Sequence, residues 1–356
     1  VLMQARAINA QNLQQGPWQK FKRLKRGYFS FLLLILLILI SCFAELIFNS
    51  KALVVQYQDE LYWPAFSSAI EGKQFGLNYE YETNYRQLKQ RWSEDGSNHS
   101  NFVLLPIVPF NATEVDLTDG AYPPLPPSMS TQHYLGTDTI GRDVLVRLVY
   151  GFRTAMFFAI TLLIVEYFFG VLIGCFMGFL GGAFDLFFQR IIEVWSNIPF
   201  LYIVMIMSSL ITPGFWSLVF IMALFGWMSM TWYMRSASYK EANRDYVLAA
   251  KMMGASNFRI IHKHIIPNTI STIITFVPFS VAGGITALTA LDFLSFGLPA
   301  PAPSWGELLK QGVDNLDHPW IISSVVISLS FVLMLVTFIG EAIREVFDPK
   351  HKIYYE

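Results

Sequence analysis

The sequence predicts an all-α polytopic membrane protein with six transmembrane helices and a small extracytoplasmic insert between helices 1 and 2. Three observations predict this fold class. The residues AVILMFWYC make up 54% of the 356-residue chain and charged residues only 14%, against roughly 25% charged in a typical soluble protein. The mean hydropathy of +0.43 excludes a disordered chain. Six separate stretches are apolar over about 20 residues, the length of a helix that crosses a bilayer.

The apolar stretches set the expected transmembrane helices. They are residues 28–48, 154–180, 191–211, 215–234, 270–291 and 320–340. The first begins like a signal peptide, but its apolar run continues past Cys42 to Phe48 and is too long for a signal core. We therefore expect a retained helix. Cys42 and Cys175 both lie in apolar runs, so a disulfide between them is not expected.

Basic residues set the expected orientation. They cluster before the first stretch and between the fourth and fifth, whereas the loop between the fifth and sixth is mainly acidic. Cytoplasmic segments are enriched in Lys and Arg, so both termini and the loop after the fourth stretch are predicted to be cytoplasmic. The expected division is a basic N-terminal segment at 1–27, a first helix at 28–48, an extracytoplasmic insert at 49–132, a membrane core with five helices at 133–344 and a cytoplasmic tail at 345–356.

The chain lacks the motifs of common catalytic and nucleotide-binding sites. It contains no G-x-x-x-x-G-K-S/T loop for ATP, and no H-E-x-x-H, C-x-x-C or G-x-S-x-G sequence. Its histidines are scattered over different loops, and its net charge of −1 gives no bias toward nucleic acid. We therefore expect no catalytic, cofactor-binding or metal-binding residues and no nucleic-acid partner. The composition favours a protein that moves a solute across the bilayer over an enzyme.

The insert at 49–132 differs in composition from the rest of the chain. It is acidic and rich in Tyr and Trp, and it ends in a proline-rich run at 123–127. Short apolar pieces such as 102–110 favour strands of a small packed domain, although Pro106 and Pro109 weaken that prediction.

The loop at 240–268 carries the most informative cytoplasmic segment. Residues 245–268 read DYVLAAKMMGASNFRIIHKHIIPN. Good helix formers at 246–253 are followed by Gly254, which permits a turn, and by a second short helix expected at 257–265 before Pro267. Two short helices at a sharp turn, joined to two spans, suit a docking element in a partner's groove. An amphipathic helix pair on the lipid surface is the alternative.

This segment resembles the EAA loop of the membrane subunits of type I ABC importers. Ala249, Ala250, Gly254 and Pro267 have the spacing of that pattern, whereas Leu248 replaces its glutamate. The resemblance implies the six-helix fold of those permeases and a contact with an ATPase subunit. The coupling residues that it implies are Asp245, Leu248, Ala249, Ala250, Gly254, Ala255, Pro267 and Asn268.

A second block, HYLGTDTIGRDVLVRLVYGFR at 133–153, is similar to the signature that precedes the second span of dipeptide and oligopeptide importer permeases. Its matching residues are His133, Gly136, Thr137, Asp138, Gly141, Arg142, Asp143 and Arg147. The two glycines permit turns, Asp138 can cap the following segment, and Arg142, Arg147 and Arg153 can form a basic helical start at the interface. A structural role of this kind is favoured over direct substrate contact.

Further matches at 190–199, 224–230, 291–299 and 339–349, together with the long insert, resemble the Yej-type permeases. These are inner-membrane subunits of microcin C and oligopeptide importers in Gram-negative bacteria, in the dipeptide and oligopeptide permease C-subunit branch. The resemblance implies a non-catalytic subunit that pairs with a second, homologous permease subunit. Cytoplasmic ABC ATPase subunits would bind ATP-Mg, and an extracytoplasmic peptide-binding protein would deliver the substrate. The insert would dock that protein or cover the outer mouth, with a stabilising cap as the alternative.

Other functions remain open at this point. Within the family, the substrate could be a dipeptide, nickel or an antimicrobial peptide. An autonomous channel or secondary carrier would show ionisable residues in several spans, and a structural or signalling protein would have no use for the docking loop.

Glu166 lies half-way along the second expected span. A charge there costs roughly 2.5–3.5 kcal/mol, and neutralising a glutamate at pH 7 costs about 3.7 kcal/mol. The two costs are too similar to decide between them. Glu166 is therefore either protonated or faces water or a partner, and it is a candidate for a residue of the transport pathway, with structural pairing as the alternative.

Overall fold

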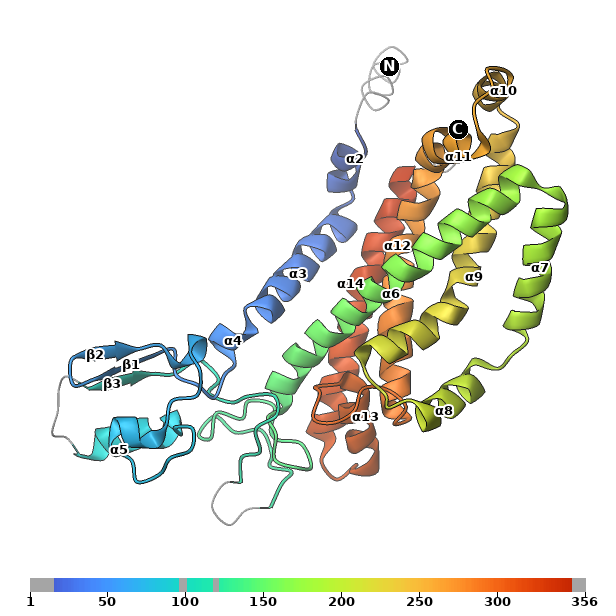
Figure 1. Ribbon diagram of the computed structural model, residues 1–356. Helices are drawn as coiled ribbons and strands as arrows, with labels where there is room; N and C mark the ends of the chain where they lie inside the picture. Colours follow the sequence, from blue (N-terminus) through green and yellow to red (C-terminus); the bar gives the residue numbers. More distant parts are fainter. Residues whose placement is uncertain (1–15, 96–100, 118–121, 348–356) are drawn as a thin grey trace, which may run out of the picture.

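The computed structural model describes residues 16–95, 101–117 and 122–347. The first part of the expected N-terminal segment and most of the expected C-terminal tail lie outside these residues. Within them, helices dominate and a small three-stranded sheet is confined to the insert. Figure 1 shows a bundle of long helices with the insert at one end and the short helices α10 and α11 at the other.

In the described ranges, five helices are long and apolar enough to cross a membrane. They are α3 (Lys25–Cys42), α6 (Val144–Leu180), α9 (Phe215–Ala242), α12 (Ile266–Phe293) and α14 (Pro319–Phe347). The short helix α2 (Pro17–Arg23) precedes the first, and α4 (Ala44–Ile47) follows it. The second span thus begins at Val144, ahead of the predicted residue 154, because Asp143 caps it there.

The third expected span, 191–211, is wrong as a single helix. Its place is taken by α7 (Gly182–Ser196) and α8 (Phe200–Leu210), which are bent by 77° at the break between them. The break falls at Pro199, which cannot donate a backbone hydrogen bond and disfavours helical geometry in the residue before it. In Figure 1 this pair returns the chain from the far end of α6 to the start of α9. Counted as one bent crossing, this pair brings the described residues to six spans.

Three glycines let α6 and α9 pack closely. Gly170, Gly174 and Gly178 follow one another at four-residue spacing, and each faces the backbone of α9. An added Cβ at Gly174 would lie 2.8 Å from the Cβ of Met234. Small residues at this spacing allow close helix contact within a membrane, where apolar burial alone drives little association.

The insert forms a small domain with its own core. Its sheet has the order β2-β1-β3, and both pairings are antiparallel. The elements are β1 (Val54–Tyr57), β2 (Glu60–Tyr62), the short 3-10 turns η1 (Pro64–Phe66) and η2 (Gly72–Phe75), α5 (Tyr85–Asp95) and β3 (Phe102–Leu104). The strand expected from 102 is confirmed, but it ends at Leu104, before Pro106. Val55, Phe75 and Leu88 are buried among these elements.

At the opposite end, the chain turns between α9 and α12. Helix α10 (Asp245–Met252) is followed by α11 (Asn257–Ile260) and a π-helical turn, η3 (Ile261–Ile265), which runs directly into α12. The helix expected at 257–265 is confirmed, but it does not stand apart from the span, because η3 continues directly into α12. Helix α2 packs at this end too, where Phe21 contacts Ile339 and Ala342 of α14.

Candidate functional site

The signature residues at 133–147 are brought together in a buried ion-pair network beside the insert. The Arg147 side chain is fully buried, and its guanidinium donates to Glu307 Oε2 at 2.5 Å and to the carbonyl of Ala112 at 2.9 Å. Arg142 donates to Asp138 Oδ2 and to Glu307 Oε1, both at 2.7 Å. Glu307 lies on α13 (Trp305–Asp314), so its carboxylate joins that helix to the start of α6.

The two aspartates of the signature, Asp138 and Asp143, have other roles than the predicted one. Asp143, and not Asp138, caps α6 by accepting from the Val146 backbone N–H at 2.8 Å. Asp138 instead accepts from the backbone N–H groups of Ile140 and Arg142 in the loop before the helix. Its second oxygen holds Arg142, so Asp138 shapes the loop and supplies a counter-charge.

The two signature glycines lie at turns with positive φ, as expected. Gly136 has φ +74°, and an added Cβ would lie 2.6 Å from the Leu125 carbonyl oxygen. Gly141 has φ +96° and a similarly close approach to the carbonyl of Asp116. Thr137 lies between them, and its hydroxyl accepts from the Leu125 N–H at 2.7 Å. The loop is thereby fixed against the proline-rich end of the insert.

The expected basic helical start holds for Arg147 and Arg153, which lie near the beginning of α6, but Arg142 precedes the helix. Arg142 and Arg147 are buried in the network, whereas Arg153 is partly exposed and pairs with Glu45 at 2.7 Å. These contacts join Ala112 of the insert, through Arg147 of α6, to Glu307 of α13. The network therefore acts as a structural connection between the insert, α6 and α13.

His133 completes the network from the insert side. Its Nδ1 lies 2.7 Å from Asp143 Oδ2 and its Nε2 lies 3.4 Å from Asp116 Oδ2, while the ring stacks on Phe110. Burial lowers the pKa of His133, but the hydrogen bonds to Asp116 and Asp143 outweigh burial and raise the pKa to about 9. The same contact with His133 lowers the pKa of Asp116. His133 is therefore a cation at neutral pH.

This shift predicts a pH-dependent stability. The pKa of His133 rises from 6.5 to about 9 on folding, so its contribution is complete below pH 6.5 and is lost as the pH rises through 9. We expect the free energy of unfolding of the detergent-solubilised protein to fall across this window by at most about 3–4 kcal/mol, with a lower unfolding midpoint. His133→Gln, measured in parallel, should flatten that slope. An equal slope in both proteins would contradict the assignment.

At the other end of the bundle, α10 presents one face to the chain and the other to solvent. Ala250 is only 3% exposed and, with Val247, packs among Ile260, Ile261 and Met234. The expected entry of Ala250 into a partner's groove is therefore wrong, because this side chain faces its own bundle. Leu248 and Met252 of α10, Met253 directly after it and Phe258 of α11 are 44%, 83%, 81% and 64% exposed, and together they are called the outward face below.

The remaining coupling-loop residues fix the direction of α10. Gly254 has φ +77°, which confirms the predicted positive-φ turn. The Ala255 N–H donates a hydrogen bond to the Ala250 carbonyl at 3.1 Å. Asp245 lies in the first turn of α10, and Ala249 is half-buried. Pro267 lies in the first turn of α12, next to Asn268, whose side chain donates to the His264 carbonyl.

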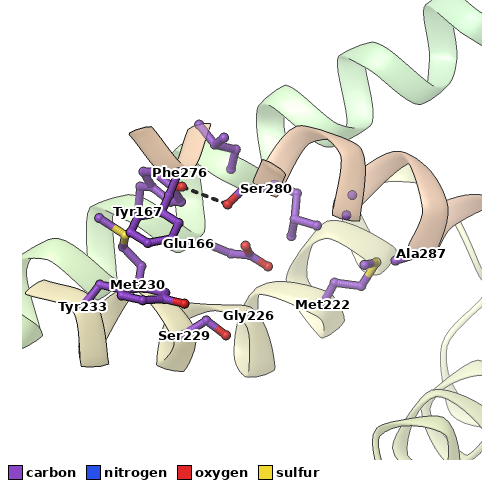
Figure 2. Close-up of a pocket in the computed structure, with 14 residues that line it drawn as sticks. Glu166, Tyr167, Met222, Gly226, Ser229, Met230, Tyr233, Phe276, Ser280 and Ala287 are labelled. Carbon is purple, nitrogen blue, oxygen red and sulfur yellow. Dashed lines mark hydrogen bonds between the residues drawn. The ribbon is translucent and has the colours of Figure 1, made fainter. Parts of the chain in front are cut away.

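Glu166 belongs neither to the ion-pair network nor to the coupling loop. Its side chain points into a cavity of about 250 Å³ between α6, α9 and α12 (Figure 2). Gly226 of α9 lies directly opposite, and any Cβ there would overlap the Glu166 carboxylate. The structure therefore places the acid at an opening between three spans, away from both ends of the bundle.

Comparison with known proteins identifies the chain. Residues 170–353 match the model of the family described as "Binding-protein-dependent transport system inner membrane component". The "Inner membrane ABC transporter permease protein YejE" of Escherichia coli is 40% identical over 96% of this chain and 98% of its own length. The chain belongs to this family of ABC importer permeases. It fits the Yej-type branch and is a multi-pass inner-membrane protein.

Two further relatives bear on the branch. The "Peptidoglycan transport system permease protein YejE" of Agrobacterium fabrum is 36% identical over 94% of this chain and 92% of its own length. The "Dipeptide transport system permease protein DppC" of Bacillus subtilis is 32% identical over 70% of this chain and 78% of its own length. Both names describe permeases, and the Yej-type relatives span almost the whole permease sequence, the insert included.

Sequence reasoning missed two acidic partners of this permease's network, Glu307 and Asp116. A signal for Glu307 was present, because the loop between the last two spans is acidic and the 133–153 block is basic. Segments of opposite charge at one end of a bundle are candidates for pairing. Asp116 had no such signal, since its partner is a histidine that becomes charged only in the folded site.

Proposed function

We propose that this permease forms half of the transmembrane pathway of an ATP-driven importer for oligopeptides and peptide-like antibiotics such as microcin C. A second, homologous permease would supply the other half, and separate ABC ATPase subunits would hydrolyse ATP. The chain itself would bind neither ATP nor another cofactor. The observation that carries the proposal is the α10 element, an exposed apolar surface attached firmly to the helices that line the Glu166 cavity.

The attachment explains how force could pass from an ATPase to the pathway. Val247 and Ala250 of α10 pack against residues of α9 and of the turns that begin α12. These are two of the three helices that line the cavity. A push on the outward face of α10 therefore moves α9 and α12 as well. Two arrangements of these helices, favoured by different nucleotide states, would open the cavity to one side or the other.

The side chains of the outward face suit a protein partner. Leu248, Met252, Met253 and Phe258 form an exposed apolar surface, and methionine adapts well to the shape of a binding groove. Lys251, Arg259 and Lys263 accompany them. A purely lipid-facing role would bring the same residues to the membrane, but it would not require the rigid turn at Gly254.

The substrate class follows from the relatives' names and from the branch. Those names describe dipeptide and peptidoglycan transport, and both substrates contain short peptides. An oligopeptide is the chemistry that they share. The test is uptake of a labelled pentapeptide of alanine by vesicles that contain this permease with its second permease, ATPase and binding protein. We expect uptake only when ATP is present on the side of the vesicle membrane that carries the ATPase subunits. ATP-independent uptake by this chain alone would instead indicate a channel or secondary carrier.

We also propose that α10 faces the cytoplasm and the insert faces the periplasm, where it would dock the binding protein or cover the pathway mouth. The basic residues support this orientation, since they gather at the α10 end. In a Cys42→Ser background, Ser68→Cys in the insert should react with a membrane-impermeant thiol reagent in intact spheroplasts. Met252→Cys should react only after rupture. The reverse pattern would invert the topology and remove the coupling role of α10.

A further inference from the structure

We propose that the cavity beside Glu166 binds the ammonium group of the transported peptide, with the Glu166 carboxylate as its counter-charge. The inference rests on the proposed function, because it names the part of the substrate that the pathway recognises. It gives a function to Glu166, which belongs neither to the ion-pair network at one end of the bundle nor to the α10 loop at the other.

The Glu166 carboxylate has no protein partner in the described part of the chain. Neither of its oxygens is within hydrogen-bond or ion-pair distance of another side chain or backbone group there, although the side chain is only partly accessible. Figure 2 shows the carboxylate directed into the open space between the helices. Gly226 has no side chain, and the Glu166 carboxylate packs into the space that a Cβ there would occupy. A charged carboxylate held in a membrane span without a partner is costly, and that cost is relieved either by protonation or by a cation such as the ammonium group proposed here.

Hydroxyl groups line the same cavity as the carboxylate. Ser229 and Tyr233 contribute theirs from α9, and Tyr167 of α6 is bonded to Ser280 of α12 at 2.8 Å. A primary ammonium group has three hydrogen-bond donors. One carboxylate and two neighbouring hydroxyls would satisfy all three. No lysine, arginine or histidine is among the fourteen residues that line the cavity, so the described part of the chain offers no competing cation.

The rest of the lining favours the end of a peptide over a bare metal ion. Calcium takes roughly 6–8 oxygen ligands, whereas this cavity has a single carboxylate, and the described residues contain no group of three His, Cys, Asp or Glu that could hold a metal ion. Leu162, Met222 and Met230 form an apolar wall that could hold a side chain. The volume of about 250 Å³ lies below the roughly 300–1,000 Å³ of drug-sized sites. It suits the first residue of a peptide, with the remainder continuing along the pathway.

The location would also permit release. The cavity walls belong partly to α9 and α12, which carry α10 between them. Movement of α10 would therefore change the distance between Glu166 and the hydroxyls of Ser229 and Ser280. A site that loses its hydroxyls would hold the ammonium less tightly, and the peptide could leave.

The test is a comparison of two peptides in vesicles that contain the complete importer. The probes are pentaalanine and N-acetyl-pentaalanine, which differ in the ammonium group. Glu166→Gln should lower the uptake rate of pentaalanine about tenfold, which corresponds to 1.4 kcal/mol. The uptake rate of the acetylated peptide should be the same in the variant and the parent. Any preference of the binding protein cancels, because it encounters the same two peptides in both sets of vesicles.

Two other variants sharpen the comparison. Glu193→Gln is the matched control, because Glu193 is exposed on α7 and pairs with Arg190, a local contact; both uptake rates should be unchanged. Ser229→Ala removes one hydroxyl without altering charge, and should give a smaller loss that is again confined to pentaalanine. This variant keeps the test decisive if Glu166→Gln fails to fold.

The outcomes separate this inference from the proposed function. If Glu166→Gln slows both peptides equally, or slows neither, while ATP-dependent uptake by the parent persists, the ammonium site is wrong and the importer assignment stands. If the parent complex takes up neither peptide with ATP, the peptide-import proposal fails and this inference fails with it. A loss that is confined to the free amine supports both.

Discussion

Arg147→Met should leave little folded protein in the membrane. The guanidinium of Arg147 is fully buried, and its removal would leave Arg142 alone to pair with both Glu307 and Asp138 among the described residues. Removing one partner from a buried pair costs about 3–5 kcal/mol, a large share of the roughly 5–15 kcal/mol that keeps a protein folded. The measurement is the yield and thermal unfolding midpoint of the detergent-solubilised protein.

Two further variants show whether the effect arises from charge. Arg153→Met is the matched control, because Arg153 is partly exposed and pairs with Glu45; an exposed pair contributes about 0–1 kcal/mol. Arg147→Met combined with Glu307→Gln restores neutrality and leaves the Arg142–Asp138 pair. The double variant should be more stable than the sum of the single effects predicts. Strict additivity would show that the network does not act as a unit.

The ends of the bundle show how far sequence reasoning extends. Apolar length predicts where most helices lie, because crossing a bilayer needs about 20 apolar residues whatever their tertiary partners. It fails at the third crossing, where two shorter apolar helices meet at a bend near Pro199. Apolar length also does not show that the helix at 257–265 continues into α12. A short helix with one exposed and one buried face has the same sequence pattern whether it ends there or continues.

The sequence predicts which residues belong to the candidate sites, but it does not predict which way their side chains face. The signature residues at 133–147 do come together, yet the burial of Arg142 and Arg147 depends on Glu307, about 160 residues later in the chain. No local pattern contains that contact. Likewise the alanines of α10 fit close packing in either direction, and only the fold shows that Ala250 faces inward. Small side chains predict close approach without saying to which partner.

Changes on the outward face of α10 should abolish transport without preventing folding. Met252→Glu places a charge on a side chain that is 83% exposed, so the permease itself loses no packing. In a partner's groove that charge would be buried without a counter-ion, which is costly. We expect peptide uptake and peptide-stimulated ATP hydrolysis in reconstituted vesicles to fall at least tenfold, or about 1.4 kcal/mol, with weaker co-purification of the ATPase.

Met129→Glu is the matched control, because Met129 is 80% exposed but lies at the insert end of the chain. ATPase co-purification should be unchanged in this variant. If Met252→Glu retains normal uptake and normal ATPase binding, the partner does not contact this face of α10.

The turn at Gly254 provides the last and most specific prediction. Its φ of +77° disfavours most side chains, yet an added Cβ would meet no atom within 4 Å. The backbone angle alone therefore decides which residues fit. Gly254→Val should disfavour the turn by roughly 1–2 kcal/mol and redirect α10, so that folded, inserted protein no longer supports uptake. Gly254→Asn should retain uptake, because asparagine tolerates positive φ. Equal activity of the two variants would mean that the direction of α10 is not what transmits the ATPase movement to α9 and α12.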